Sequence, residues 1–233
     1  MRTLQQGNTG PEVGLLRRLL NRKAVPSPRL PEANVNGARY NGAMARIDFG
    51  PQTHNAVKAF QRARGLKEDG IVGPKTWKAL GLTIDINCRV VPASQPTNNT
   101  CYAAAATMVL GPMGAMSFDP GPTPPGVAPD DHWARTFSRQ FTWHIEYGMS
   151  PMPGALARFF SGGPFWFAGN LPFPTGPSYH AVVAGSMWGD DTAEGTMVLI
   201  HDPWPPNAGE TYGIILGDYV SANPMAFRYI LHR

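Results

Sequence analysis

Apolar residues recur at helical spacing in three short segments near the N-terminus. The first segment opens at Gly10-Pro11-Glu12, and one stripe of its surface carries Val13, Leu15, Leu16, Leu19 and Leu20. The second opens at Gly50-Pro51 and the third at Gly73-Pro74. Proline suits the first helical position because its nitrogen has no hydrogen to leave unpaired. We predict three helices, ending before Pro26, at Gly65 and at Leu80.

An internal repeat supports the second and third helices. The nine residues from Phe49 to Val57 align with those from Val72 to Leu80, with Gly, Pro, Thr and Ala identical at the same offsets. Each copy is an apolar residue, a turn glycine, a proline and an apolar helix face. The repeat predicts two helices entered in the same way and does not by itself indicate a ligand.

The second half of the chain has a different pattern. Four alanines with Met and Leu predict a helix from Cys101 that stops at Gly111-Pro112. Runs rich in apolar residues around 180–185 and 197–202 predict strands, and residues 83–92 read as a strand or an extended connector. We therefore predict the α+β class, with a small three-helix domain over residues 1–82, a linker over 83–93 and a second domain over 94–233.

Composition and charge sharpen this division. The chain has 233 residues, 42% hydrophobic and 15% charged, and no run of about 20 apolar residues, so we predict no membrane span. Residues 1–84 carry 14 Lys/Arg and 5 Asp/Glu, whereas residues 85–233 carry 6 and 11. The basic part suits an anionic partner, or it simply has solvated arginine-rich helix faces. No nucleic-acid recognition motif accompanies the charge, so we predict no nucleic-acid partner.

Candidate chemistry gathers around Cys101. Asn98, Asn99 and Thr100 favour a helix start before it, where the helix dipole and free N–H groups stabilise a thiolate. An inert cysteine at a helix start is the alternative. Later in the chain His180 lies near the start of one predicted strand and Asp202 at the end of another. Adjacent strands would bring that carboxylate against the imidazole and orient it.

The N-terminal segments resemble the three-helix peptidoglycan-binding module of bacterial wall hydrolases. The matching stretches are residues 4–13, 56–66 and 69–77, within a resemblance that covers 3–82 apart from a longer loop at 24–46. The resemblance implies peptidoglycan as a partner and puts binding residues at the turns. The candidates are Asp48, Phe49, Asp69, Gly70 and Trp77. A spacer role for the module, and core packing for Phe49 and Trp77, are the alternatives.

Residues 90–233 resemble papain-like cysteine peptidases, most closely a subgroup with bacterial effector peptidases. The resemblance rests on Gln95-Pro96-Thr97 through Cys101-Tyr102-Ala103-Ala104-Ala105, on Gly162-Gly163-Pro164, and on Asp202-Pro203-Trp204. It implies a catalytic helix packed on an antiparallel sheet. It also implies that Cys101 is the nucleophile, His180 the base and acid, Asp202 the orienting carboxylate and Gln95 the oxyanion donor. Tyr102 replaces the usual Trp beside the site and is a candidate substrate contact, and the Gly/Pro-rich stretch 111–131 is a candidate substrate-shaping loop.

Other residues give weaker signals. We expect Cys88 to be a small buried side chain. A disulfide to Cys101 in an oxidising compartment is the alternative, and it would silence the nucleophile. His54, His132 and His144 read as packing residues in helical or aromatic-rich surroundings, and His201 is expected on the strand face opposite Asp202. No His-x-x-x-His spacing, phosphate loop or dinucleotide fingerprint is present, so we predict no metal and no cofactor.

The two resemblances together imply a peptidoglycan hydrolase that cleaves an amide bond of wall peptides by a thiol mechanism. The N-terminus holds no apolar signal segment, so we expect synthesis in the bacterial cytoplasm and action outside it, in the periplasm or wall of a target cell. A type VI secretion effector with a cognate immunity protein and an endolysin are both consistent. The rivals are a protein-cleaving effector peptidase and an inactive wall-binding adaptor. We expect a monomer.

Overall fold

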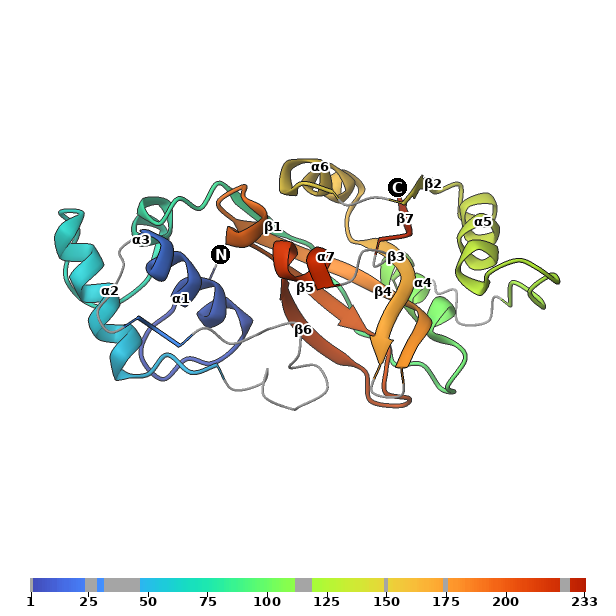
Figure 1. Ribbon diagram of the computed structural model, residues 1–233, viewed down its shortest axis with the longest axis horizontal. Coiled ribbons are helices and arrows are strands. Elements are labelled where there is room, and N and C mark those ends of the chain that lie inside the picture. The colour runs from blue at the N-terminus through green and yellow to red at the C-terminus, as the bar shows by residue number, and fades with distance from the viewer. Residues whose placement is uncertain are drawn as a thin grey trace.

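The computed structural model describes residues 2–23, 29–31, 47–111, 119–148, 151–173, 176–222 and 227–233. Seven α-helices and seven strands are assigned within these ranges (Figure 1). The helices are α1 (Pro11–Lys23), α2 (Pro51–Ala63), α3 (Pro74–Ala79), α4 (Cys101–Leu110), α5 (Pro129–Phe141), α6 (Pro153–Phe159) and α7 (Leu216–Ala222). The strands are β1 (Ile84–Asn87), β2 (His144–Tyr147), β3 (Phe165–Phe173), β4 (Gly176–Gly189), β5 (Thr196–Asp202), β6 (Glu210–Ile215) and β7 (Tyr229–His232).

The three N-terminal helices begin where the sequence predicts. Each starts at the proline of a Gly-Pro pair, and α2 and α3 have extended glycines at the N-cap. Short bridges between Leu4 and Val72 and between Thr9 and Asp48 tie the loops together. The leucine stripe of α1 is fully buried, so these helices form a small module around one apolar centre.

The rest of the chain folds around one antiparallel sheet. Its strand order is β2-β7-β3-β4-β5-β6, and β1 pairs with β4 beyond the end of β3. The long strand β4 is therefore central: its first part pairs with β3 and its last part with β1, and β5 runs along its other side. This arrangement agrees with the predicted α+β class.

The two faces of the sheet bury different helices. Side chains alternate along β3, so Phe165 and Phe167 join one apolar cluster, whereas Trp166 and Ala168 join another. The first cluster also holds residues of α1, α6 and α7, and the second holds residues of α4 and α5. Figure 1 shows the N-terminal helices at one end of the molecule and α4 and α5 at the other.

The N-terminal module is docked against the sheet. Helix α1 contacts β5 and β6, and the core of the module continues into the cluster on that sheet face. Arg18 forms two 2.7 Å hydrogen bonds with the carboxylate of Asp218, and Lys23 pairs with Asp190 at 3.3 Å. The segment predicted as a linker contains β1, which is a strand of the sheet, so the connection between the two parts is built into the second part.

Two smaller expectations need correction. Asp130 and Asp131 do not belong to a loop: they form the first turn of α5, where carboxylates favour the positive end of the helix dipole. His144 lies in β2 and not in a helix. The loop prediction for 112–118 falls outside the described residues. Within the described part of the chain, no helix is long and apolar enough to cross a membrane.

Candidate functional site

Helix α4 begins at the predicted nucleophile. Cys101 is its first residue and is 4% exposed. Thr100 occupies the N-cap position, but its side chain does not cap the helix; its hydroxyl instead bonds within the turn, to the carbonyl of Thr97. The N–H groups at the start of a helix carry partial positive charge, so the sulfur sits where negative charge is stabilised.

His180 and Asp202 come together through the strand register. Val183 pairs with His201 across β4 and β5, so Asp202 is level with Val182, and His180 lies two residues further along on the same face. The Nε2 atom of His180 is 2.7 Å from Oδ1 of Asp202, and both side chains are almost completely buried. Adjacent strands thus bring the predicted base and the predicted carboxylate into direct contact.

His180 also interacts with Cys101, which completes a chain of three side chains. Burial by itself lowers the pKa of His180, but the negative charges of Asp202 and Cys101 and hydrogen bonds to both raise it to about 9. The imidazole is therefore protonated at neutral pH, and its positive charge lies between the sulfur and the carboxylate. This is the charge pattern of a thiol nucleophile paired with histidine.

Asp202 receives two donors that the sequence did not indicate. The backbone N–H of Trp204 donates to its Oδ1 at 2.8 Å, and the hydroxyl of Tyr212 donates to its Oδ2 at 3.1 Å. Trp204 is part of the Asp202-Pro203-Trp204 motif, but it acts here through its backbone N–H, and Tyr212 lies on β6 outside any motif. Alternation along β6, which puts Tyr212 on the face of Asp202, is the signal that would have found it.

Gln95 is held next to the loop after Asp202, but its described hydrogen bonds do not involve Cys101, His180 or Asp202. Its backbone bonds to Pro203 and Asn207 anchor it to the loop after Asp202. Its side chain is fully buried, and Nε2 donates to the carbonyl of Thr97 at 2.6 Å. The Oε1 atom has no hydrogen-bond partner among the described residues. The structure thus joins Cys101, His180 and Asp202 and leaves the oxyanion role of Gln95 a prediction.

Tyr102 follows Cys101 and is partly buried. Its ring stacks on Trp133 of α5, with the ring centres 5.0 Å apart. Burial, then the charges of Asp119 and Cys101, raises the pKa of its hydroxyl. The ring therefore borders the candidate nucleophile, and its role as a substrate contact stays a prediction.

His201 points away from the catalytic chain, as expected from strand alternation. Its Nδ1 lies 3.1 Å from the hydroxyl of Thr211, and burial lowers its pKa. A pocket of about 190 Å³ is lined in part by Asp202, His201 and Met108 of α4. His201 is thus a neutral packing residue behind the site.

A second candidate site lies in the N-terminal module. A pocket of about 530 Å³ is bordered by the end of α2, the following turn and the start of α3. Its apolar part includes Leu66 and Ile71, and Ile71 is 38% exposed. Lys67, Asp69 and Lys75 border it as charged groups, and Lys67 is paired with Asp69 at 3.5 Å. The pocket therefore combines an apolar part with charged groups of both signs.

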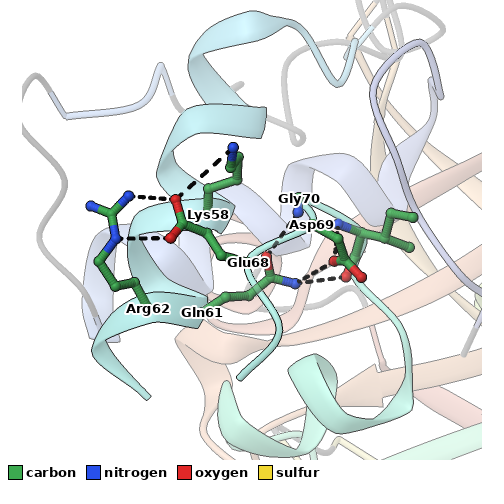
Figure 2. A network of polar contacts seen from close by, with 7 residues as sticks. Lys58, Gln61, Arg62, Glu68, Asp69 and Gly70 are labelled. Carbon is green, nitrogen blue, oxygen red and sulfur yellow. Dashed lines mark hydrogen bonds and ion pairs between the residues drawn. The ribbon is translucent and has the colours of Figure 1, made fainter. Parts of the chain in front are cut away.

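Gln61 holds the turn that borders this pocket (Figure 2). Its Oε1 accepts the N–H of Gly70 at 2.9 Å, and its Nε2 donates to the carbonyl of Ile71 at 2.9 Å and to Asp69 at 3.1 Å. The N–H of Ile71 also bonds to Asp69 and lowers the pKa of that carboxyl. A single buried amide therefore organises the whole turn.

Figure 2 also shows an ion cluster on the outer side of α2. Arg62 bonds to both oxygens of Glu68, and Lys58 lies 3.9 Å from the same carboxylate. These bonds lower the pKa of Glu68 and raise that of Arg62. The groups are exposed to solvent, so the cluster contributes little to stability.

The predicted binding residues of the module have different positions. Asp69 borders the pocket. Phe49 and Trp77 are 1% and 2% exposed, so these two side chains are packed in the core, which is the stated alternative, and a role for them in binding stays a prediction. Gly70 has φ +72°, and a Cβ atom there would lie 2.1 Å from the ring of His54. The glycine is therefore needed for the turn itself, and its side of the turn is covered by His54.

Comparison with known proteins supports the module. Residues 9–80 match the family described as "Putative peptidoglycan binding domain". The chain is 39% identical over 72 residues to the zinc D-Ala-D-Ala carboxypeptidase of Streptomyces albus G, which is 30% of this chain and 28% of that enzyme. It is 51% identical over 45 residues to an uncharacterized protein in the bpoA1 3' region of Kitasatospora aureofaciens, which is 19% of this chain and 38% of that protein.

The family match covers the N-terminal module, residues 9–80. The chain spans less than two fifths of either relative. One relative is named as a zinc enzyme, whereas the sequence of this chain predicts a cysteine hydrolase. Among the residues that the structure describes, no three His, Cys, Asp or Glu side chains are grouped as a metal site. The papain-like resemblance of residues 90–233 stays a prediction.

Proposed function

We propose that this protein is a peptidoglycan hydrolase that cleaves an amide bond of wall peptides with Cys101 as nucleophile. The observation that carries the proposal is a row of three buried side chains that interact in sequence. Cys101 is the first residue of α4, His180 interacts with it, and Asp202 bonds to His180. The peptidoglycan-binding module in the same chain supplies the substrate class. A zinc D-Ala-D-Ala carboxypeptidase among the similar proteins is consistent with a hydrolase of this class.

The first half of the proposed reaction transfers the acyl group to sulfur. The Cys101 thiolate attacks the carbonyl carbon, a C–S bond forms, and the carbonyl electrons move onto oxygen. When the tetrahedral intermediate collapses, the C–N bond breaks and His180 gives its proton to the leaving amine. The high pKa of His180 suits this step, because the ring is already protonated when the amide binds.

The second half regenerates the enzyme. Water attacks the thioester carbonyl and passes a proton to His180, and the C–S bond then breaks to release a carboxylic acid and the thiolate. Asp202 stays ionised and orients the imidazole throughout. The oxyanion is stabilised by the backbone N–H of Cys101 and by the amide of Gln95, whose second N–H is not used by the bond to Thr97.

The N-terminal module raises the local concentration of substrate. We assign wall binding to the pocket beside Gln61, whose apolar part and two lysines suit a polymer of sugars and peptides with free carboxylates. Because α1 is packed on the sheet, binding there also restricts the orientation of the catalytic part. Tethering of this kind increases the rate of encounter without a new contact at the active site.

We further propose that the protein acts outside the cytoplasm, in the wall or periplasm of a target cell. The substrate lies only there, and this location follows from the proposed activity. Delivery by a secretion machine with a cognate immunity protein remains a prediction. Expression of the protein in the cytoplasm and in the periplasm of a test bacterium separates the locations, since lysis is expected only from the periplasmic form.

The direct test is digestion of purified sacculi under reducing conditions, with products identified by mass spectrometry. Wild type is compared with Cys101→Ala and with the matched control Cys88→Ala. New muropeptides are expected from wild type and Cys88→Ala, and at least about a thousandfold fewer from Cys101→Ala. Their masses identify the bond that is cleaved.

Three outcomes contradict the proposal. Full activity in Cys101→Ala that a chelator abolishes would indicate a metal-dependent hydrolase. Intact sacculi together with cleavage of an unfolded protein would indicate a protein-directed peptidase that only docks on the wall. Binding of the protein to sacculi, measured by sedimentation, without any cleavage would leave a wall-binding protein without this activity.

A further inference from the structure

The carboxylate of Asp202 is bonded from three separate segments of the chain. His180 on β4 and the backbone N–H of Trp204 bond to Oδ1, and the hydroxyl of Tyr212 on β6 bonds to Oδ2. The side chain of Asp202 is completely shielded from solvent. A buried carboxylate remains ionised only where hydrogen-bond donors replace the water that it loses.

Tyr212 reaches Asp202 because of the register between β5 and β6. Asp202 pairs with Glu210 and Ile200 pairs with Tyr212, so Tyr212 is the diagonal neighbour of Asp202 on the same face of the sheet. Its side chain is buried, at 6% exposure. The hydroxyl therefore has little freedom to turn toward solvent, and it is directed at the second carboxylate oxygen.

We propose that Tyr212 is a positioning residue of the candidate thiol site: its hydroxyl fixes the plane of the Asp202 carboxylate so that Oδ1 faces His180, and it keeps that carboxylate ionised in mildly acidic solution. A carboxylate turns about its Cβ–Cγ bond, and a bond on each oxygen prevents this rotation. The role rests on the proposed function, because it takes Cys101 and His180 as the reacting pair.

The other charged groups near Asp202 define what a pH experiment reports. His180 on β4 faces it directly, and Cys101 on α4 acts through His180. Glu210, across the ladder on β6, is exposed, and its charge opposes ionisation of Asp202. His201 lies on the other face of β5. These groups are the same in a Tyr212 variant, so a change in the acidic titration reports the missing hydroxyl.

The experiment measures the ultraviolet absorbance of the Cys101 thiolate as a function of pH. All proteins carry Cys88→Ala, and the spectrum of Cys101→Ala is subtracted. In Tyr212→Phe the ring is retained and only the hydroxyl is lost. We expect the midpoint at which the thiolate disappears on acidification to rise by roughly one pH unit or more, because a hydrogen bond to an ionised group is lost. The same shift is expected in the acidic limb of sacculus digestion.

Tyr229→Phe is the matched control. Tyr229 is also buried, at 5% exposure, and its hydroxyl bonds to a different carboxylate, that of Asp131. Its acidic midpoint is expected to equal that of the parent protein. An unshifted midpoint in Tyr212→Phe would overturn the role of Tyr212, and equal shifts in both tyrosine variants would do so as well. A parent protein without any Cys101 thiolate would instead overturn the proposed function, and this role with it.

If Tyr212→Phe does not fold, an NMR measurement on the protein without this substitution tests the same role. Carbon-13 at Cζ of tyrosine reports hydrogen bonding of the hydroxyl by NMR. The Tyr212 signal of the parent protein is expected to shift with the same midpoint as the thiolate absorbance. A Tyr212 signal that stays constant across this midpoint would show that the hydroxyl does not sense the carboxylate and would overturn the proposal.

Discussion

Two buried glutamines differ between the N-terminal module and the candidate site in how fully their amides are hydrogen-bonded. Gln61 and Gln95 are 1% and 0% exposed. Gln61 uses both ends of its amide: Oε1 accepts from Gly70, and Nε2 donates to two acceptors in the turn before α3 and to the hydroxyl of Thr76 in α3. Gln95 uses one N–H, toward Thr97, and its Oε1 has no partner among the described residues.

The two amides differ in how much of their hydrogen-bonding capacity is used. A fully bonded buried amide fixes the backbone around it, and its removal leaves several polar groups without partners. A partly bonded amide next to a nucleophile keeps hydrogen-bonding capacity for a charge that forms only during a reaction. The same residue type is therefore fully hydrogen-bonded in the N-terminal module and only partly hydrogen-bonded beside the candidate site.

Substitution of Gln95 is expected to have the largest effect, and the effect is on catalysis. Loss of one oxyanion donor lowers kcat by about a hundredfold to a thousandfold. In Gln95→Ala we expect a decrease of this size in sacculus digestion, with KM little changed. Unfolding in urea provides the control for stability. A variant that keeps its kcat would remove Gln95 from the proposed mechanism and limit oxyanion stabilisation to the backbone.

The same substitution at Gln61 is expected to act on stability. Gln61→Ala leaves the N–H of Gly70 and the carbonyl of Ile71 without their partner, which costs about 2–3 kcal/mol of unfolding free energy. Urea unfolding measures this loss, and Gln52→Ala at an exposed position of α2 is the matched control. If Gln61→Ala unfolds like wild type but loses wall binding, the amide contacts ligand and the contrast with Gln95 fails.

The pH dependence of stability sharpens the contrast, because the group responsible, His180, lies in the second part of the chain. The pKa of His180 is raised from 6.5 to about 9 in the folded protein. Its contribution to stability is therefore complete below about pH 6.5 and is lost as the pH rises through about 9. Urea unfolding between these values should show a fall in free energy that Asp202→Asn reduces.

His201 does not interfere with this measurement. Its pKa is lowered by burial, so its contribution to stability is present above its ordinary pKa and is lost only as the pH falls. An unfolding free energy that stays flat from pH 6.5 to 9 in wild type would mean that His180 is not held as an imidazolium. The proposed charge pattern of the site would then be wrong.

Much of the local structure was predictable because the signals are local. The Gly-Pro pairs before α1, α2 and α3 mark helix starts, since proline fits the first helical position whatever the rest of the chain does. Gly111 ends α4 with φ +77°, a conformation that glycine adopts readily. The positions of Cys101 at a helix start and of Asp202 at a strand end followed from the same kind of local reasoning.

Other features depended on long-range contacts. In the sheet, β7 lies between β2 and β3. The segment predicted as a linker contains β1, which pairs with β4. For Phe49 and Trp77 the sequence left both core packing and ligand contact open, because an aromatic residue at a turn fits either role until its neighbours are known. The pairing of Arg18 with Asp218 joins residues 200 positions apart, and no sequence spacing indicates it.

The sequence by itself determined the helix starts, the resemblance of the N-terminal module to peptidoglycan-binding domains and the residue types of the candidate site. Capping, turn chemistry and hydrophobic periodicity act over a few residues, so they can be read along the chain. Only the tertiary structure decided that Tyr212 bonds to Asp202, that Gln61 is fully satisfied while Gln95 is not, and that α1 packs on the sheet. These features are set by strand register and by burial, which arise when distant segments pack together.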